Sequence, residues 1–295
     1  TGFPRGMRFY PSILQRLLTR SKYNKLQKLC NIQFDIVWSF DNSVFYNFEA
    51  LPKEVFCISH IVDLNQNFQT AKAAKSADLC LGVIPQLVER LKKFNAKTHL
   101  VTHGVQDFPD NIETIELPGR NDIKALYAGN MMMPHIDWQC LSSIAKKNPH
   151  VDFIFIGPNW EVNRNSHKIE LERLKNTHTL AAVSALMLPS YLKSASVLLL
   201  AYTSEYSLNY ASPHKMMEYL ASGTPIISSF LKDYDEHSES GLILTAKTEH
   251  DFNQHLASFT SNLGARTSRK NSEQRIQFCI ENSYFNKIKE IEYLI

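Results

Sequence analysis

The chain has 295 residues, of which 44% are hydrophobic and 21% are charged, and its formal net charge is +3. This composition is typical of a globular protein with room for two domains of roughly 100–150 residues each. The charge is too small, and the basic residues too scattered, to predict a protein that binds nucleic acid. A mildly basic surface is compatible with anionic ligands such as nucleotide diphosphates, and with an anionic membrane face.

The cysteine spacing and the apolar runs bear on the cellular compartment of the protein. No Cys-x-x-Cys pair occurs among the five cysteines, Cys30, Cys57, Cys80, Cys140 and Cys279. This pattern favours a reducing compartment over a disulfide framework or a zinc site. The longest strongly apolar runs are far too short to cross a bilayer, and no signal peptide is recognisable. Because the chain begins with Thr1 rather than Met, we expect a processed product or a fragment.

Short apolar runs alternate with amphipathic ones in the first hundred residues. Strands are expected at 34–40, 55–61, 79–84 and 99–103. Helices are expected over roughly 10–30, 66–77 and 85–94. The polar segment 104–122, which contains Pro109, Pro118 and Gly119, predicts a linker.

The same alternation restarts after the linker. Strands are expected at 123–129, 151–157, 178–183, 196–202, 224–229 and 241–245. Helices are expected near 136–148, 164–175, 189–195, 213–222, 249–262, 269–281 and 284–294. Strands that are apolar throughout and are each followed by a helix favour parallel sheets covered on both faces. The sequence therefore predicts an α/β fold with two Rossmann-like domains.

Ligands of such sheets bind just beyond the carboxyl ends of the strands, so the residues there are the first candidates for a site. In the first domain these candidates are Asp41, His60, Asp63, His103 and Gly104. In the second domain they are Gly129, Asn130, Gly157, Pro158 and Tyr202.

The segment SPHKMMEYLASGTPIIS, residues 212–228, adds a helix start to these candidates. Ser212 is a favoured N-cap and Pro213 a favoured first helical residue. The free N–H groups of that turn and the helix dipole predict an anion site, to which Lys215 adds a charge. Glu218, one turn further, can accept hydrogen bonds from vicinal hydroxyls. The alternative is that Lys215 and Glu218 form an ordinary solvent-exposed pair.

Four segments, which follow one another along the chain in the family's order, together resemble parts of GT-B fold glycosyltransferases. Residues 212–228 resemble the donor-site pattern Pro-x-Lys-x-x-Glu-Tyr-Leu-Ala-x-Gly-x-Pro-Val-Ile of that family. The other matching segments are 74–105, 125–158 and 176–202. The likeness is to the group 1, retaining-type bacterial enzymes that build surface polysaccharides or glycolipids.

The resemblance implies the GT-B architecture, in which two Rossmann-like domains face each other across a cleft. The expected domains are then an acceptor-side domain over 1–108, a nucleotide-sugar domain over 120–280, and a terminal helix over 281–295 that crosses back to the first domain. No strand with a Gly-rich turn precedes residues 34–40. The first domain is therefore expected to be truncated or highly diverged at its start.

The resemblance also implies an activity, the transfer of a sugar from a nucleotide-sugar donor to a glycan or lipid-linked acceptor. By this resemblance, Lys215 would contact the diphosphate of the donor, and Glu218 would bind the ribose of its nucleotide. The further donor-binding residues would be Gly129, Asn130, Gly157, Pro158, Tyr202, Ser212, Pro213 and Met216. The catalytic candidates are His60 and Asp63, for which the alternatives are a histidine bonded to a backbone carbonyl and an aspartate that caps the next helix. The acceptor-side or hinge candidates are Asp41, His103 and Gly104.

Two departures from the family pattern bear on the chemistry. Tyr210 occupies the place of a second glutamate, which leaves open whether transfer is retaining or inverting. No Arg or Lys soon follows Gly129, so neutralisation of the donor phosphates would depend mainly on Lys215 and the helix dipole.

The sequence shows no paired acidic residues at a strand end, so we predict a metal-independent hexosyltransferase with no cofactor beyond a UDP- or GDP-sugar. The expected location is the cytoplasm, with peripheral association at the inner membrane surface; the oligomeric state stays open. Two alternatives remain. One is a catalytically degenerate domain that binds a nucleotide-sugar or a partner protein, and the other is a nucleotide-sugar epimerase.

Overall fold

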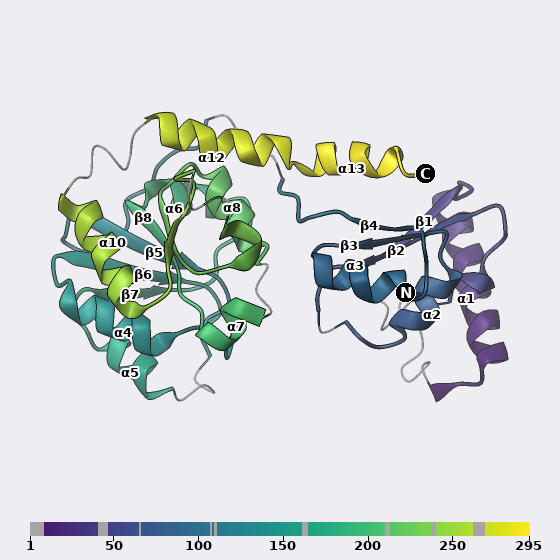
Figure 1. Cartoon of the computed structure of the whole chain (residues 1–295), viewed down its shortest axis with the longest axis horizontal. Coiled ribbons are helices and arrows are strands. Elements are labelled where there is room, and N and C mark those ends of the chain that lie inside the picture. The colour runs from purple at the N-terminus through teal and green to yellow at the C-terminus, as the bar shows by residue number, and fades with distance from the viewer. Residues whose placement is uncertain are drawn as a thin grey trace. The chain divides into compact units, whose positions relative to one another are not determined.

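The computed structural model describes residues 9–40, 47–64, 66–106, 108, 111–160, 165–209, 213–235, 237, 240–261 and 269–295. The chain forms two compact units (Figure 1). The first unit comprises Thr1–His103 with Ile288–Ile295, and the second comprises Gly104–Lys287. The segment 104–122, expected to be a linker, is thus counted with the second unit.

The first unit contains a four-stranded sheet in the order β1-β2-β3-β4, in which every pairing is parallel. Its strands are β1 (Ile36–Ser39), β2 (Phe56–Ile61), β3 (Leu79–Gly82) and β4 (Thr98–Leu100). Its helices are α1 (Ser12–Cys30), the 3-10 turn η2 (Phe48–Ala50), α2 (Thr70–Ser76) and α3 (Pro85–Lys92). The register places His60 of β2 beside Leu81 of β3.

Both faces of the central strands β2 and β3 are buried, which explains why these two strands are largely apolar, whereas the outer strands β1 and β4 are partly exposed. Successive residues of β2 point to opposite faces. Cys57 packs in one hydrophobic cluster, with Leu87 of α3, and its neighbour Ile58 packs in another. That second cluster includes Ile291, the buried residue of α13 (Tyr284–Glu292). The first unit is therefore covered on one face by α3 and on the other in part by the C-terminal helix.

The second unit contains a six-stranded parallel sheet in the order β10-β9-β8-β5-β6-β7. Its strands are β5 (Ile123–Ala128), β6 (Val151–Ile156), β7 (Thr177–Leu180), β8 (Val197–Leu200), β9 (Ile226–Ser229) and β10 (Leu244–Ala246). Its helices are α4 (Trp138–Lys147), α5 (Ser166–Glu172), α6 (Leu188–Ser194), α7 (Ser204–Asn209), α8 (Lys215–Ala221), η3 (Lys232–Tyr234), α10 (Glu249–Ser261), α12 (Arg269–Glu281) and the start of α13.

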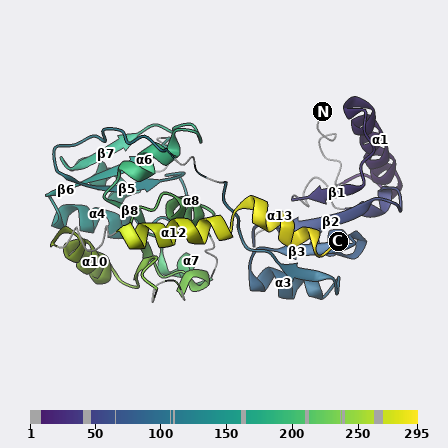
Figure 2. The ribbon, with the colours of Figure 1, turned by 90° about the horizontal axis from the view of Figure 1, so that it is seen from above.

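The strand order of the second unit fixes where its ligands can bind. From β5 the chain runs outward to β6 and β7, and it then returns to β8 on the other side of β5. The crevice beyond the carboxyl ends of β5 and β8 is therefore a topological switch point, the usual ligand site of such sheets. Helix α10 packs on α4 and on β9 and β10, and α12 packs on α8 (Figure 2).

The predicted α/β class with parallel sheets is confirmed, and the differences lie in short elements. Helix α7 occupies a stretch for which no helix was predicted. Helix α2 begins at Thr70 rather than near 66, and β10 covers Leu244–Ala246 rather than 241–245. In the part of the chain that the structure describes, no helix combines the length and apolar character needed to cross a membrane.

Candidate functional site

The side chain of the half-buried Lys215, on the first turn of α8, lies at the carboxyl end of β5. Its Nζ donates a 2.9 Å hydrogen bond to the hydroxyl of Tyr127. The same Nζ lies 4.5 Å from the centroid of the Tyr127 ring and 5.9 Å from that of Tyr202. Burial lowers the pKa of Lys215 to about 8, an effect that the nearby Glu218 opposes. None of the ion pairs between described residues includes Lys215. The ammonium is thus poorly solvated and suited to an anion.

Gly129, the residue that follows β5, leaves the space that this ammonium occupies. It has φ +155°, and a Cβ built on it would overlap Lys215 Nζ and lie 3.0 Å from the Tyr127 hydroxyl oxygen. Any side chain at this position would therefore displace the lysine. Glycine is required here for close approach as well as for the backbone conformation.

Gly157, which follows β6, approaches the same point from the next strand. It has φ +146°, and a Cβ on it would overlap the carbonyl oxygen of Gly129. The N–H of Gly129 donates to the carbonyl of Ile156 at 2.8 Å, and the N–H of Met131 donates to the carbonyl of Pro158 at 3.0 Å. The ends of β5 and β6 are thus bonded together with their backbones in contact.

Helix α8 begins later than the sequence predicted, and its start offers fewer free N–H groups. Its first residue is Lys215, and His214 provides no side-chain cap. The N–H of Met216 is bonded to the carbonyl of Pro213 at 2.9 Å, and that of Met217 to His214 at 3.0 Å. The attraction for an anion therefore comes chiefly from Lys215. Ser212 lies outside the described residues.

Met216 does not fit its predicted role as a donor contact. Its side chain is fully buried in the hydrophobic core, and its N–H is already bonded to Pro213. Glu218, two residues further, fits its role better. Its carboxylate is half-buried and makes no hydrogen bond or ion pair with a described residue, so it can accept hydrogen bonds from a ligand.

Two tyrosines of the site were not among the residues predicted from the sequence. Tyr127 binds Lys215, and the hydroxyl of Tyr219 accepts a 2.7 Å hydrogen bond from the N–H of Ala128. The Tyr219 hydroxyl also lies 3.3 Å from the carbonyl of Ala128. Tyr219 thus fixes α8 to the end of β5. For Tyr127, the signal in the sequence is a tyrosine near the end of the strand IKALYA, whose other residues apart from Lys124 are aliphatic.

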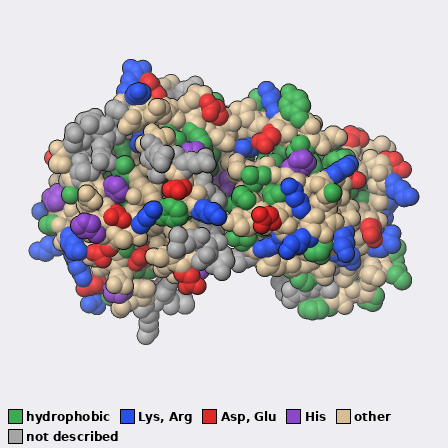
Figure 3. Space-filling view, in the orientation of Figure 1, with side chains coloured by type: hydrophobic (Ala, Val, Ile, Leu, Met, Phe, Trp, Pro, Cys, Tyr) green, Lys and Arg blue, Asp and Glu red, His purple; other side chains and the backbone are tan. Residues whose placement is uncertain are grey.

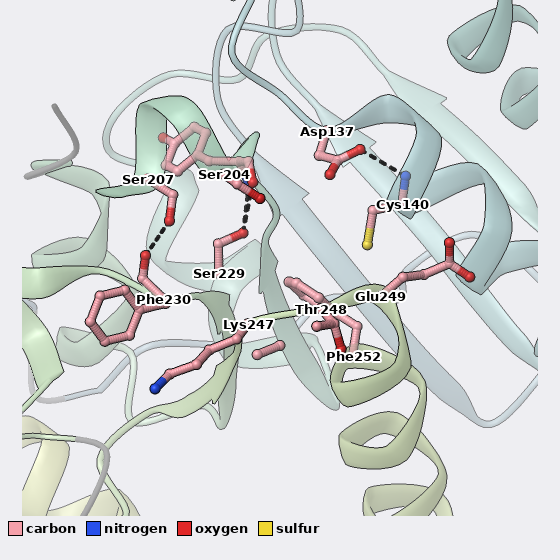
Figure 4. A pocket seen from close by; sticks show the side chains of 12 residues that line it. Asp137, Cys140, Ser204, Ser207, Ser229, Phe230, Lys247, Thr248, Glu249 and Phe252 are labelled. Atoms are coloured by element: carbon pink, nitrogen blue, oxygen red, sulfur yellow. Dashed lines mark hydrogen bonds between the residues drawn. The ribbon is translucent and has the colours of Figure 1, made fainter. Parts of the chain in front are cut away.

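A cavity of about 350 Å³ opens on the other half of the same sheet edge, at the ends of β8, β9 and β10 (Figure 4). Tyr202 is the one predicted site residue that lines it. The N–H of Tyr202 donates a 2.8 Å hydrogen bond to the Ser229 hydroxyl, which also lines the cavity. Several further hydroxyl and carboxylate side chains face it, namely Asp137, Ser204, Ser207, Thr248 and Glu249.

The structure thus brings four predicted donor residues together, namely Gly129, Gly157, Lys215 and Tyr202. Two others lie beside them in the chain. Asn130 is exposed, and its side-chain oxygen accepts a 3.0 Å hydrogen bond from the N–H of Met132. Pro158 is half-buried, and its carbonyl accepts the hydrogen bond from Met131.

His60, at the end of β2 in the first unit, is buried. Among the described residues neither ring nitrogen has a hydrogen-bond partner, so none of these residues offers the carbonyl of the alternative interpretation. The ring stacks on Trp38 at a centroid distance of 5.8 Å and lies 5.1 Å from Phe40. Burial, and secondarily His103, lowers the pKa of His60 to about 4. The imidazole is therefore neutral at pH 7.

The other candidates of the first domain were Asp63, Asp41, His103 and Gly104. Asp63 is exposed, and because α2 begins at Thr70 with Gln69 as its N-cap, Asp63 does not cap that helix. Asp41 lies outside the described residues. A Cβ on Gly104, where the chain passes from one unit to the other, would come within 2.7 Å of the Tyr284 ring.

No cluster of three or more His, Cys, Asp or Glu side chains suited to a metal ion occurs in the part of the chain that the structure describes. Metal independence stays a prediction.

Comparison with known proteins gives one family and a set of solved structures. Residues 124–262 match the family described as "Glycosyl transferases group 1". This range includes Gly129, Gly157, Tyr202, Lys215 and Glu218. Among curated protein sequences, no significant match is found.

The similar solved structures share a fold with this chain at low sequence identity. HepE of Anabaena, solved in complex with UDP, has a TM-score of 0.71 and 11% identity, over 96% of this chain and 83% of that one. The sucrose-phosphate synthase of Thermosynechococcus elongatus has a TM-score of 0.68 and 12% identity, over 95% and 77%. A glycosyltransferase of Rickettsia africae has a TM-score of 0.68 and 13% identity, over 95% and 81%.

Proposed function

We propose that the chain, whose residues 124–262 match a group 1 glycosyltransferase domain, is a GT-B enzyme that moves a hexosyl group from a UDP- or GDP-sugar to a glycan or lipid-linked acceptor. The observation that carries the donor assignment is the ammonium of Lys215 beside Gly129. It lies at the switch point of a parallel sheet and has no carboxylate partner among the described ion pairs. A donor diphosphate would supply the missing negative charge.

The role of the site follows from the charge that develops on the donor during sugar transfer. As the bond between the sugar and the diphosphate breaks, negative charge accumulates on the leaving phosphate. A preorganised cation in a poorly solvated site stabilises that charge. Lys215 would have this role, and Glu218 would bind the ribose hydroxyls of the nucleotide. The exposed backbone beyond Gly157 would lie near the base.

His60 and Asp63 are proposed for different roles on the acceptor side. A histidine whose pKa is lowered to about 4 is a weak base at neutral pH. We therefore assign His60 a packing role beside Trp38 and Phe40 rather than a contact with the substrate, because its ring nitrogens are buried. The exposed Asp63 is the better candidate to accept a proton from the acceptor hydroxyl.

Calorimetry with UDP-, GDP-, ADP- and dTDP-sugars tests the donor site. We expect one nucleotide to bind with micromolar affinity, and both Lys215→Ala and Glu218→Ala to abolish that binding. Lys193→Ala, which removes an exposed lysine of α6, is the matched control and should bind as the wild type does. Failure of every nucleotide to bind, or binding that persists in Lys215→Ala, would contradict the assignment.

Turnover separates the transferase from the alternatives. A transferase should release free nucleotide from the bound donor, with or without an acceptor, and activity should persist in EDTA if no metal is required. A degenerate domain would bind the donor without consuming it. An epimerase would convert the sugar without releasing nucleotide.

Helix α1 supports the further proposal that the enzyme binds an anionic membrane surface. Its buried residues are polar or aromatic: Gln15, Thr19 and Tyr23. Most of its aliphatic residues are exposed, Ile13 by 74% and Leu17 by 63%. On the face of the first unit seen in Figure 3, hydrophobic side chains lie among both basic and acidic ones.

The charge of this surface points to its partner. Residues 9–34 contain no Asp or Glu, and four basic residues of α1 are exposed, Arg16, Arg20, Lys25 and Lys28. A helix that exposes both leucines and cations fits the interface of a membrane with anionic lipids. Sedimentation with vesicles tests this: the protein should pellet with vesicles rich in phosphatidylglycerol and stay in solution with pure phosphatidylcholine. Equal behaviour with both, or no loss of binding in Leu17→Ser, would contradict it.

A further inference from the structure

The hydroxyl of Tyr127 is the one hydrogen-bond acceptor that the structure gives to Lys215 among the described residues. Tyr127 is fully buried at the end of β5, and its hydroxyl oxygen accepts the 2.9 Å hydrogen bond from Nζ. The 4.5 Å distance from Nζ to the ring centroid adds a cation–π contact. One tyrosine thus binds the ammonium through both its oxygen and its ring.

This contact has an alternative that the structure does not adopt. Lys215 and Glu218 are three residues apart on α8, a spacing at which oppositely charged side chains commonly pair. No ion pair between them occurs in the structure, whereas Nζ lies where a Cβ of Gly129 would be. Tyr127 and Gly129 together account for this choice, because one supplies an acceptor and the other leaves the space.

We propose that Tyr127 is a positioning residue, which holds the ammonium of Lys215 beside Gly129 and away from Glu218, so that both charged groups are free for the ligand. This inference rests on the donor role of Lys215 proposed above. It extends that role, because it assigns a function to a strand residue that would not itself need to touch the donor. It also makes donor binding depend on pH through Lys215.

The groups around the ammonium determine which of them titrates. Tyr127 faces it from β5, Tyr202 from the end of β8, and Glu218 and Tyr219 lie on α8 itself. Burial raises the pKa of all three tyrosines far above neutrality, so they stay uncharged. Lys215 is therefore the group whose charge changes near pH 8.

Two substitutions should move the titration of Lys215 in opposite directions. Tyr127→Phe keeps the ring and removes the oxygen that stabilises the charged form, so the pKa of Lys215 should fall by roughly 0.5–1 unit. Gly129→Ala places a Cβ where Nζ lies and forces the ammonium toward solvent and Glu218. In that variant the pKa of Lys215 should rise toward its ordinary value.

The test is an NMR titration of protein labelled with ¹³C at the lysine Cε, in which Lys215 is assigned from the signal lost in Lys215→Arg. Tyr191→Phe removes a hydroxyl of α6 in the same unit and is the matched control; its Lys215 titration should equal that of the wild type. A fall in Tyr127→Phe or, if that variant does not fold, a rise in Gly129→Ala supports the proposal. An unchanged titration in either folded variant overturns it.

A second measurement separates this inference from the proposed function. Calorimetry with UDP and with GDP between pH 6.5 and 9 should show wild-type affinity falling about tenfold from pH 7 to 9, as the lysine loses its charge. The decline should begin at lower pH in Tyr127→Phe. If the Lys215 titration moves as expected but neither nucleotide binds at any pH, the positioning role stands and the donor assignment fails. If a nucleotide binds through Lys215 and the titration is unchanged, the donor assignment stands and the positioning role fails.

Discussion

The guanidinium of Arg275, on α12, donates a 3.2 Å hydrogen bond to the carbonyl oxygen of Gly223, just beyond the end of α8. Its Nε donates a second hydrogen bond, of 2.9 Å, to the carbonyl of Leu242, which precedes β10. Arg275 is 3% exposed, and burial lowers its pKa to about 10, so it stays charged at neutral pH. One side chain therefore joins three segments and fixes the end of the helix that carries Lys215.

Replacing Arg275 with Met should lower the free energy of unfolding by about 2 kcal/mol, because two buried carbonyl groups lose their donor. Arg275→Lys should cost nearly as much, since a single ammonium cannot reproduce the fork that reaches both segments. Urea denaturation measures both. The control is Arg269→Met on the same helix, whose side chain is 92% exposed and whose loss should change stability by less than about 0.5 kcal/mol. A stable Arg275→Met protein would contradict the joining role.

The sheets could be predicted from the sequence because their central strands are buried on both faces. Residues such as Ile154 and Leu198 lie in runs that are apolar throughout, and the structure places both at the centre of the second sheet. Helix α7 could not be predicted in the same way. The stretch Ser204–Asn209 has no apolar periodicity, and its position depends on contacts with distant residues, such as the hydrogen bond from Ser207 to the carbonyl of Phe230.

The site was predicted only where a strand end or a motif indicates it. Lys215 and Gly129 follow from those rules, but the hydrogen bond from Lys215 to Tyr127 joins residues that are 88 positions apart in the chain. Nothing local in the sequence indicates that pairing. The late start of α8 has a similar cause, since the rule for Ser-Pro helix starts does not include the bonds that Pro213 and His214 make in the folded chain.

Asp152 in β6 is a buried carboxylate that should stabilise the second unit at neutral pH. Its Oδ2 accepts a 2.8 Å hydrogen bond from Lys124 Nζ and another of 2.8 Å from the N–H of Asn121, and His178 lies 3.3 Å from its Oδ1. Burial raises the pKa of this carboxyl, but the bonds from Lys124, Asn121 and His178 outweigh it and hold the pKa below its ordinary value. Asp152→Asn should therefore cost about 2 kcal/mol at pH 7.

The pH dependence of that cost has a defined sign. A carboxyl whose pKa is lowered by folding contributes stability that is complete above its ordinary pKa and is lost as the pH falls through its value in the folded protein. The difference between wild type and Asp152→Asn should therefore shrink below about pH 4. Urea denaturation at pH 7, 5 and 3.5 measures it, with Glu273→Gln at an exposed ion pair as the control. A difference that does not change with pH would show that the carboxylate charge is not the cause.

His60 should reduce the stability of the first unit, because both its ring nitrogens are buried and neither has a partner among the described residues. The lowered pKa means that the unfolded chain binds a proton between about pH 6.5 and 4 and the folded chain does not. Wild-type stability should therefore fall as the pH falls through this window. His60→Phe, which keeps an aromatic ring between Trp38 and Phe40, should be more stable by on the order of 1–2 kcal/mol at pH 5. Thermal unfolding at pH 5 and 8 checks this. If His60→Phe is less stable at both, the imidazole makes a stabilising contact.

Lys215 should reduce the stability of the second unit while it serves donor binding. Lys215→Met removes the cost of burying an ammonium and should raise the unfolding free energy at pH 7 by about 2 kcal/mol, while it abolishes donor binding. Because the lysine has a pKa of about 8 in the folded chain and 10.5 ordinarily, the unfolded chain binds one proton more between these values. Wild-type stability should thus rise from pH 8 to 10.5 and approach that of the variant.

Chemical denaturation at pH 7 and 9.5 measures this gain, and Lys193→Met, at an exposed position of α6, controls for the change in side-chain type. The gain at pH 7 should be absent from the control and smaller at pH 9.5. A saturating nucleotide should stabilise the wild type and leave Lys215→Met unchanged, since only the wild type has the cation that binds it. If Lys215→Met is destabilised at pH 7, the ammonium is not held against its solvation preference. In that case burial of the charge would no longer explain why this site should attract an anion.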